Sequence, residues 1–262
     1  MDEIIRSLLI PLSRATEVVI LSGAGLSADS GIPTFRDGAT GLWANIDPDE
    51  VVSIDGFKRN PEKVWAWHKA LHDLFAEARP NAGHIGIAAL ERLLTKARIT
   101  VITQNIDGLH QAAGSSHVLE IHGSALRVRC HRHCGFVDQW PVGQTGPRQC
   151  PSCGSPARPD VVWFGEALDS ELLSLAAEIA ASADIFFTVG TSSVVQPAAS
   201  LSMLARDGGA LLVEVNPHET AFTEYADHSV RAGASRFFPA LSEALSVKSI
   251  DRFPGSPYPD SQ

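Results

Sequence analysis

Long apolar runs are missing from this 262-residue sequence, and its first residues lack the pattern of a secretory signal. The longest apolar stretches, such as 18–21, stop far short of the roughly 20 residues that cross a bilayer. The first residues include Asp2 and Glu3, whereas a secretory signal starts with basic residues that precede an apolar segment. We therefore expect a cytoplasmic protein that has no membrane partner.

Basic residues are fewer than acidic residues. The sequence has 30 acidic and 21 basic residues, which gives a formal net charge of -9. Proteins bind duplex DNA largely by neutralising its phosphates with Lys and Arg, so we expect no nucleic-acid partner. With 44% hydrophobic residues, the chain can bury one large core, alone or with a small accessory module.

Cysteine is scarce and confined to one short segment, which excludes a disulfide framework spread over the domain. The four cysteines form two pairs that can converge on one tetrahedral ion, Cys130-x3-Cys134 and Cys150-x2-Cys153. Four thiolates form a closed zinc site, so we expect one structural Zn²⁺ with no catalytic role. A ligand from His131 or His133, four free thiols and a nucleic-acid-binding ribbon are the alternatives.

Signatures of several other enzyme classes are absent too. The first glycine-rich segment lacks the lysine of a P-loop, which disfavours binding of a nucleoside triphosphate. There is neither a glycine-flanked serine elbow nor a cysteine outside the 130–153 segment to act as a nucleophile. Catalysis would therefore need a cofactor together with a general base.

What the sequence does contain is an alternation of apolar strand patterns and helical patterns. Strands are predicted at 17–21, 99–103, 118–121, 185–189 and 210–215, and helices at 84–96, 170–181 and 197–206. This order predicts an α/β fold, in which a Rossmann-like, mostly parallel sheet carries helices on both faces. We assign 1–45, 80–127 and 158–250 to this large part.

Two segments break the alternation and predict a small inserted domain. One is a helical module at 46–79, in which Asn60 caps a helix whose first turn contains Pro61. The other is the zinc ribbon at 128–157. The remaining residues, 251–262, are rich in proline and offer little to bury, so we expect a loose tail.

A strand that leads into Gly23-x-Gly25-x-x-Ala28 predicts a dinucleotide site, in which a turn and the start of a helix hold the pyrophosphate through backbone N–H groups. The ribose-binding acid of hydride-transfer enzymes does not follow, so that reaction is disfavoured. A second loop carries Phe35 and Arg36, which could cover the nucleotide. The alternative places Phe35 in the core and Arg36 on the surface.

Polar residues follow two of the predicted strands, at 103–110 and 121–123. Ligands of parallel sheets bind beyond the carboxyl ends of the strands, so these residues are expected to face the cofactor. His122 is the candidate general base, because an imidazole titrates close to neutral pH. A structural histidine with its hydrogen bonds satisfied is the alternative.

Seven motifs occur in the order seen in sirtuins, and the chain resembles the bacterial-type members of that family from about Ser13 to Leu245. The motifs are 23–27 (GAGLS), 31–36 (GIPTFR), 103–110 (TQNIDGLH), 122–123 (HG), the two cysteine pairs, 159–166 (PDVVWFGE) and 190–192 (GTS). The resemblance implies one catalytic domain of the predicted architecture, with its active site in the cleft between the large and small parts.

The same resemblance implies the reaction. Sirtuins remove acyl groups from protein lysines with NAD as co-substrate, and release nicotinamide and 2'-O-acyl-ADP-ribose. His122 would be the general base toward the ribose hydroxyls, Asn105 would orient the ribose and a water, and Asp107 would help to hold nicotinamide. The residues implied to bind NAD are Gly23, Ala24, Gly25, Ser27, Ile32, Phe35, Arg36, Gln104, Asn105, Ile106, Asp107, Gly190, Thr191, Ser192, Asn216 and Ala234.

The resemblance also implies how an acylated lysine is recognised. The run Val161-Val162-Trp163 would pair with an extended peptide as an added strand, and Phe164, Gly165 and Glu166 complete this segment. Sirtuins that remove succinyl or malonyl groups share a tyrosine and an arginine that bind the acyl carboxylate. Matched on Val64-Trp65, those places hold His68 and Leu71, which predicts a preference for uncharged groups such as acetyl unless His68 or His72 replaces the missing partner.

Three other functions stay open from sequence alone. Protein ADP-ribosyl transfer and NAD hydrolysis begin with the same loss of nicotinamide, although the presence of His122 favours deacylation. A zinc-ribbon module that senses NAD without turnover is the non-enzymatic alternative. We expect the chain to act as a monomer.

Overall fold

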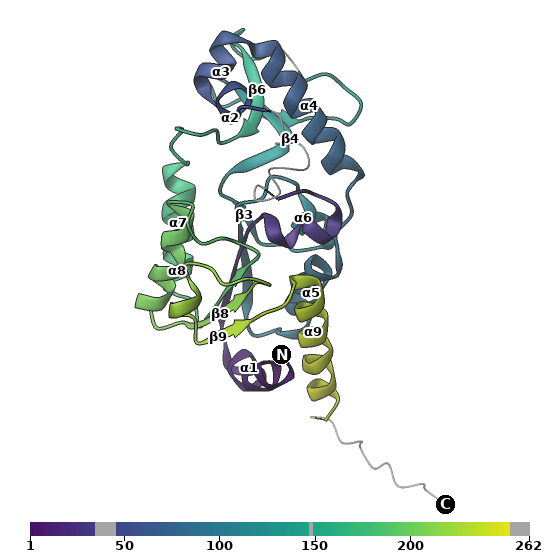
Figure 1. The fold of residues 1–262 in the computed structure, drawn as a ribbon, viewed down its shortest axis with the longest axis vertical. Coiled ribbons are helices and arrows are strands. Elements are labelled where there is room, and N and C mark those ends of the chain that lie inside the picture. The colour runs from purple at the N-terminus through teal and green to yellow at the C-terminus, as the bar shows by residue number, and fades with distance from the viewer. Residues whose placement is uncertain (35–45, 147–148, 252–262) are drawn as a thin grey trace, which may run out of the picture.

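A six-stranded parallel sheet forms the centre of the larger part of the molecule (Figure 1). The computed structural model describes residues 1–34, 46–146 and 149–251. The strand order is β3-β2-β1-β7-β8-β9, and every pair is parallel. The strands are β1 (Glu17–Ser22), β2 (Arg98–Thr103), β3 (Val118–Glu120), β7 (Ile185–Val189), β8 (Leu211–Val215) and β9 (His228–Val230).

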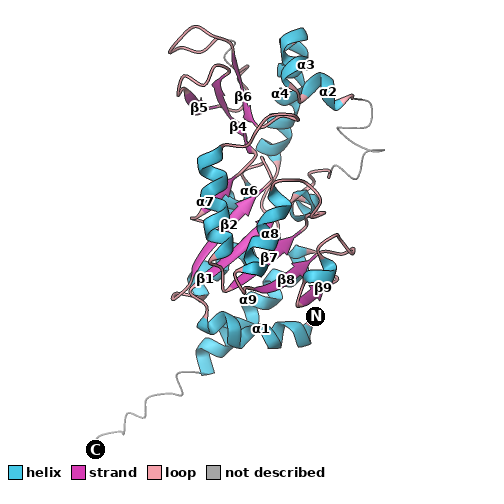
Figure 2. Ribbon diagram, turned by 90° about the vertical axis from the view of Figure 1, so that its left-hand side faces the viewer, coloured by secondary structure: helices cyan, strands magenta, loops and turns pink. Residues whose placement is uncertain are grey.

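Both faces of this sheet are buried, which explains why its strands read as continuous apolar runs. Along β1, Val18 and Ile20 face one core, while Val19 and Leu21 face the other. The first core is closed by α1 (Asp2–Arg14), α5 (Ala82–Leu93) and α9 (Ala234–Asp251). The second is closed by α7 (Ser170–Ala181) and α8 (Ala198–Asp207), which lie over the side of the sheet nearer the viewer in Figure 2. The predicted α/β fold is thus confirmed.

Several elements were not predicted from the sequence. Helices α1 and α9 each contain a proline, Pro11 and Pro239, which interrupts the helical pattern although tertiary packing maintains the helix. The short helix α6 (Leu109–Ala113) and strand β9 were also missed. The helix predicted after the first glycine loop is instead two short 3-10 turns, η1 (Ala24–Leu26) and η2 (Ala28–Ser30).

The smaller part lies beyond one end of the parallel sheet (Figures 1 and 2). It combines the helices α2 (Pro48–Val51), α3 (Ile54–Arg59) and α4 (Pro61–Glu77) with an antiparallel sheet of β4 (Gly123–Cys130), β5 (Val137–Gln139) and β6 (Ala157–Val161). As predicted, Asn60 caps α4, because its Oδ1 accepts a hydrogen bond from the backbone N of Lys63 at 3.0 Å.

One hydrophobic core joins the helical module to the ribbon. Trp65 on α4 meets Trp140 edge to face with ring centroids 5.1 Å apart, and His72 stacks on the same Trp140 at 4.5 Å. Across the described ranges, no helix has both the length and the apolar character needed to span a bilayer. The tail predicted to be loose begins at Asp251, the last residue of α9, and the rest of it lies outside the described residues.

Candidate functional site

The four cysteine sulfurs of the ribbon meet in one cluster. Each Sγ lies within 4.8 Å of the others, with Cys130 and Cys153 at 3.6 Å and Cys134 and Cys150 at 3.5 Å. Sulfurs around a tetrahedral zinc lie about 3.8 Å apart, given Zn–S bonds of about 2.3 Å. The donor set therefore fits one Zn²⁺ that needs little rearrangement of the loops.

The two neighbouring histidines do not join this cluster. In the described part of the chain, the group that could hold a metal contains the four cysteines and no histidine nitrogen. The ring of His131 instead packs against Phe57 of α3, with centroids 5.3 Å apart. The ribbon thus has a closed set of four thiol ligands, and His131 of the ribbon contacts the helical module.

At the carboxyl end of the sheet, two glycine-containing loops lie in direct backbone contact. The backbone N of Gly25 donates to the carbonyl of Gly190 at 2.8 Å. A Cβ on Gly25 would lie 2.7 Å from that oxygen, and Gly190 has a φ of +58°. Both loops were predicted to hold NAD, and Ala24 and Ser192 lie within them. Glycine is required here because only a bare backbone allows this approach.

A buried polar network follows the first loop. Ser27 Oγ donates to Asp107 Oδ2 at 2.7 Å, while Asn105 Nδ2 donates to the carbonyl of Gly23 and to Ser27 Oγ, both at 3.1 Å. Burial raises the pKa of Asp107, although the hydrogen bonds from Leu109 N and Ser27 act in the opposite direction. The segments 23–27 and 104–107, both predicted to bind the cofactor, are therefore one connected unit.

His122 is anchored to this unit. Its Nδ1 lies 3.1 Å from the carbonyl oxygen of Gln104, and since a carbonyl only accepts, Nδ1 carries the proton. The neutral ring then has a bare Nε2, which is the form that a general base requires. Partial burial lowers the pKa of His122, an effect that the Gln104 hydrogen bond opposes. On the side of the segment predicted to bind substrate, Val162 N donates to the His122 carbonyl at 3.0 Å.

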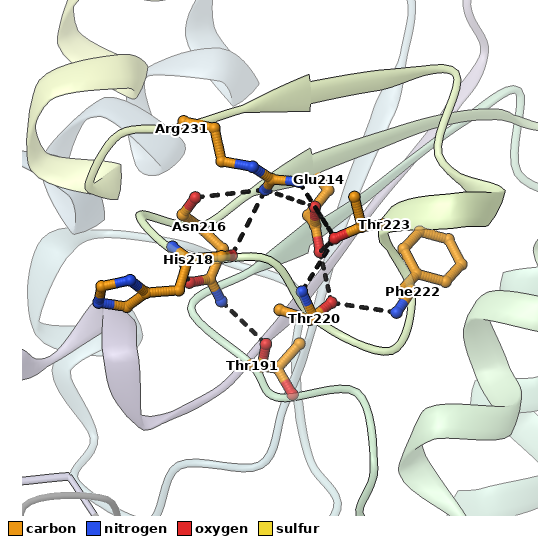
Figure 3. Close-up of polar contacts among 8 residues, drawn as sticks. All are labelled: Thr191, Glu214, Asn216, His218, Thr220, Phe222, Thr223 and Arg231. Carbon is orange, nitrogen blue, oxygen red and sulfur yellow. Dashed lines mark hydrogen bonds and ion pairs between the residues drawn. The ribbon is translucent and has the colours of Figure 1, made fainter.

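Thr191 connects the loop after β7 to two other predicted cofactor segments. Its hydroxyl accepts from Gln104 Nε2 at 3.1 Å. Its carbonyl accepts from Asn216 Nδ2 at 2.9 Å, as Figure 3 shows. The other residues predicted to bind the cofactor lie in different parts of the fold. Ile32 and Ile106 pack with the core of the small part, and Ala234 begins α9. Phe35 and Arg36 lie outside the described residues.

The segment predicted to pair with the substrate is folded around a buried arginine, Arg158. Its guanidinium donates to both carboxylate oxygens of Glu166, at 2.6 and 2.8 Å, and to the carbonyl of Val161 at 2.7 Å. Its Cζ lies 3.2 Å from the ring centroid of Trp163, whose backbone N donates to Glu166 at 2.8 Å. The Glu166 carboxylate therefore stabilises the conformation of the segment. Phe164 is 55% exposed beside Gly165.

The two residues predicted to line the acyl pocket, His68 and Leu71, are buried on α4. His68 Nε2 accepts from the indole N–H of Trp163 at 3.0 Å. Burial lowers the pKa of His68 to about 3, and the positive charge of Arg158 acts in the same direction. The imidazole is thus neutral at physiological pH, and its acceptor nitrogen is already used.

Sequence reasoning did not assign roles to some polar residues behind the site. Ser22 Oγ lies 2.8 Å from Thr103 Oγ1 and 2.9 Å from His110 Nε2, and all three side chains are buried. Thr103 Oγ1 in turn accepts from Asn105 N at 3.0 Å. Thr103 and His110 are the first and last residues of the 103–110 motif, so the sequence did contain a pattern that pointed to these two residues. Arg158 carried no such signal, because its partners become apparent only in the folded chain.

Together, the parallel sheet with its glycine loops and the thiol cluster define an α/β dinucleotide-binding protein with a structural metal ribbon. The model of the Sir2 family matches residues 23–197. The chain belongs to the Sir2 family.

Individual relatives agree over nearly the whole chain. It is 45% identical over 235 residues to NAD-dependent protein deacylase 1 of Caldanaerobacter subterraneus subsp. tengcongensis, covering 88% of this chain and 95% of that protein. It is 46% identical over 235 residues to an NAD-dependent protein deacylase of Mycobacterium tuberculosis, covering 87% and 97%.

Solved structures show the same fold. A crystal structure of a Sir2 homolog in complex with NAD superposes with a TM-score of 0.85 at 40% identity, and the match covers 93% of this chain and 94% of that one. A structure of Sir2 bound to an acetylated peptide gives a TM-score of 0.79 at 31% identity, with coverage of 93% and 99%.

Proposed function

We propose that this protein removes acyl groups from lysine side chains of proteins in an NAD-dependent reaction that releases nicotinamide and 2'-O-acyl-ADP-ribose. The observation that carries the proposal is the bond between His122 Nδ1 and the Gln104 carbonyl, which attaches the general base to the predicted cofactor segment. Membership of a family whose compared members are named NAD-dependent protein deacylases supports it.

The cofactor would lie across the contacting backbones of 23–27 and 190–192, where glycines leave N–H groups accessible to phosphate. Bound NAD would supply an electrophilic ribose carbon with nicotinamide as its leaving group. His122 would accept a proton from a ribose hydroxyl at Nε2, while Asn105 would orient the ribose and a water. Asp107, held by Ser27, would help to bind nicotinamide.

The substrate would be an acylated lysine in an extended peptide that pairs with 161–163. This pairing is supported by the rigid turn that Arg158 and Glu166 hold behind it. Backbone pairing places little demand on the peptide sequence, so many proteins could serve as substrates. The zinc held by the four cysteines would keep the ribbon folded and would take no part in the reaction.

We propose a preference for uncharged acyl groups such as acetyl. A carboxylate buried in the acyl pocket needs a cationic or hydrogen-bonding partner. His68 is neutral and already accepts from Trp163, Leu71 is apolar, and His72 Nε2 is bonded to the Trp140 carbonyl at 2.7 Å. We expect kcat/KM for an acetylated peptide to exceed that for its succinylated counterpart by at least about tenfold. A faster succinyl reaction would exclude this preference.

The activity is tested by measuring nicotinamide release with and without acetylated peptide. A deacylase requires the peptide, whereas an NAD hydrolase does not. His122→Ala should lower kcat by about 100-fold or more, since a positioned general base contributes about that much. Modification of a protein with ADP-ribose that persists in this variant would instead favour ADP-ribosyl transfer.

We also propose that the protein acts as a cytoplasmic monomer without a nucleic-acid partner. Four cysteines that form one metal-type cluster and no disulfide suit a reducing compartment. The net charge of -9 opposes both self-association and phosphate binding. Light scattering coupled to size-exclusion chromatography tests the oligomeric state.

A further inference from the structure

A buried glutamate lies in β8 beside the predicted cofactor site. Glu214 is only 1% exposed, and its carboxylate accepts hydrogen bonds from two threonines and one arginine (Figure 3). Thr223 Oγ1 donates to Oε2 at 2.8 Å and Arg231 Nη1 donates to the same oxygen at 2.6 Å, while Thr220 Oγ1 donates to Oε1. An acid at such a position is stable only because it is paired in this way.

The partners of this acid all come from one stretch of chain. Thr220 and Thr223 belong to the connection between β8 and β9, and Arg231 follows directly after β9. Thr220 and Thr223 also bond to each other, since Thr220 N donates to Thr223 Oγ1 at 2.9 Å. Glu214 is therefore the common acceptor around which the 216–231 segment folds.

The same network reaches Asn216, which begins that segment. Arg231 Nη1 donates to the carbonyls of Asn216 and His218, at 3.5 and 3.4 Å. The Asn216 side chain accepts from His218 N at 3.1 Å and donates to the Thr191 carbonyl at 2.9 Å. The orientation of the Asn216 amide, and its link to the loop after β7, thus depend on how Glu214 holds Arg231.

We infer that Glu214 is a positioning residue for NAD binding, which acts by fixing the turn that presents Asn216 and Thr191. This inference rests on the proposed function, in which both residues contact the cofactor. Glu214 itself need not touch NAD, because its carboxylate is fully engaged. Its removal should therefore weaken NAD binding while the peptide segment at 161–166 and His122 keep their geometry.

The test compares Glu214→Gln with Glu219→Gln. Both variants remove one negative charge from the same region, but Glu219 is exposed on the connection. We expect Glu214→Gln to raise the Kd for NAD, measured by calorimetry without peptide, about tenfold, since a hydrogen bond to a charged group contributes that much. KM for NAD should rise in parallel, with kcat and the peptide KM within about twofold. Glu219→Gln should bind NAD like the parent protein.

A second variant covers the case in which Glu214→Gln does not fold. Thr223→Val keeps the Glu214–Arg231 pair but removes the hydroxyl that donates to Glu214 and accepts from Thr220 N and Arg231 Nη2. A smaller rise in the NAD Kd is expected, with a normal circular dichroism spectrum. A folded Glu214→Gln protein with an unchanged NAD Kd, or with a lower kcat at unchanged Kd, would overturn the inference. A parent protein that binds NAD without turning over acetylated peptide would instead refute the proposed function, and the Kd comparison would still decide this inference.

Discussion

A single imidazole, that of His122, depends on one carbonyl oxygen for its orientation. The bond to Gln104 selects the tautomer whose free nitrogen can accept a proton. The same geometry makes the residue sensitive to pH, because the free nitrogen titrates in a half-buried environment.

The pH dependence of the reaction follows from the direction of this shift. Burial lowers the pKa of His122 from 6.5, so the ring remains an unprotonated base at more acidic pH than a free histidine. We expect the acidic limb of the kcat/KM profile for acetylated peptide to have its midpoint below pH 6.5. A midpoint above that value would show that another group, or a raised histidine pKa, controls the reaction.

Arg158 stabilises the segment that contains Glu166. It is almost fully buried and its guanidinium binds both oxygens of Glu166, so replacing it by methionine leaves this partly buried carboxylate with only the Trp163 N–H and the longer contact to Arg129. We expect Arg158→Met to lower the free energy of unfolding by about 3–5 kcal/mol in urea denaturation. The double variant with Glu166→Gln should lose less than the sum of the two single changes, because the charges interact directly. Additive losses would contradict this coupling.

At the scale of elements, the ribbon and helix α4 depend on each other. The hydrophobic core they share includes Trp65 and Trp140, and the cysteine cluster joins the two loops of the ribbon. Loss of the metal is therefore expected to affect more than the two cysteine pairs.

Cys153→Ser tests this dependence. Removing one of four thiolates should lower zinc content and thermal stability together, because binding of a structural metal contributes directly to folding. Zinc is measured by mass spectrometry and stability by circular dichroism melting. Lost activity with normal zinc content and an unchanged Tm would contradict a structural role for the metal.

The contact between the two glycine loops supports another prediction. Gly25→Ala places a Cβ 2.7 Å from the Gly190 carbonyl and should push the loops apart, which weakens NAD binding by about tenfold or more. Gly209→Ala is the control, since its Cβ meets nothing within 4 Å and its φ of +87° imposes only local strain of about 1–2 kcal/mol. Equal NAD affinities for the two variants would argue against a cofactor site at this contact.

At the scale of the whole molecule, several histidines are buried in the neutral form. Burial lowers the pKa of His68 to about 3, of His84 to about 4 and of His110 to about 3. In the unfolded chain these groups return toward 6.5, so between pH 6.5 and 4 the unfolded state binds protons that the folded state does not. Each group then lowers the free energy of unfolding as the pH falls, by up to about 1.4 kcal/mol per pH unit.

We therefore expect urea denaturation to show a marked loss of stability from pH 7 to pH 5. His68→Gln should reduce the slope, because one titrating group is removed, whereas His117→Gln at an exposed position should leave it unchanged. The same slope for the parent protein and His68→Gln would show that His68 does not contribute to acid sensitivity.

The sequence alone determined the architecture in its main lines, because buried parallel strands are apolar runs that few other structures explain. It placed β1, β2, β7 and β8 to within one or two residues and gave the bounds of α7. It also identified the cysteine pairs, whose spacing is a local property. It missed α1 and α9, where tertiary packing outweighs the effect of an internal proline.

Only the tertiary structure decided which polar side chains meet. The indole of Trp163 and the imidazole of His68 are 95 positions apart, and nothing in the spacing of either motif predicts their hydrogen bond. The same holds for Glu214 with Arg231, and for Glu166, whose carboxylate turns inward to Arg158. Local patterns determine strands, turns and metal knuckles. These pairings, whether 95, 17 or 8 positions apart, form only when the chain folds back and buried charges require partners.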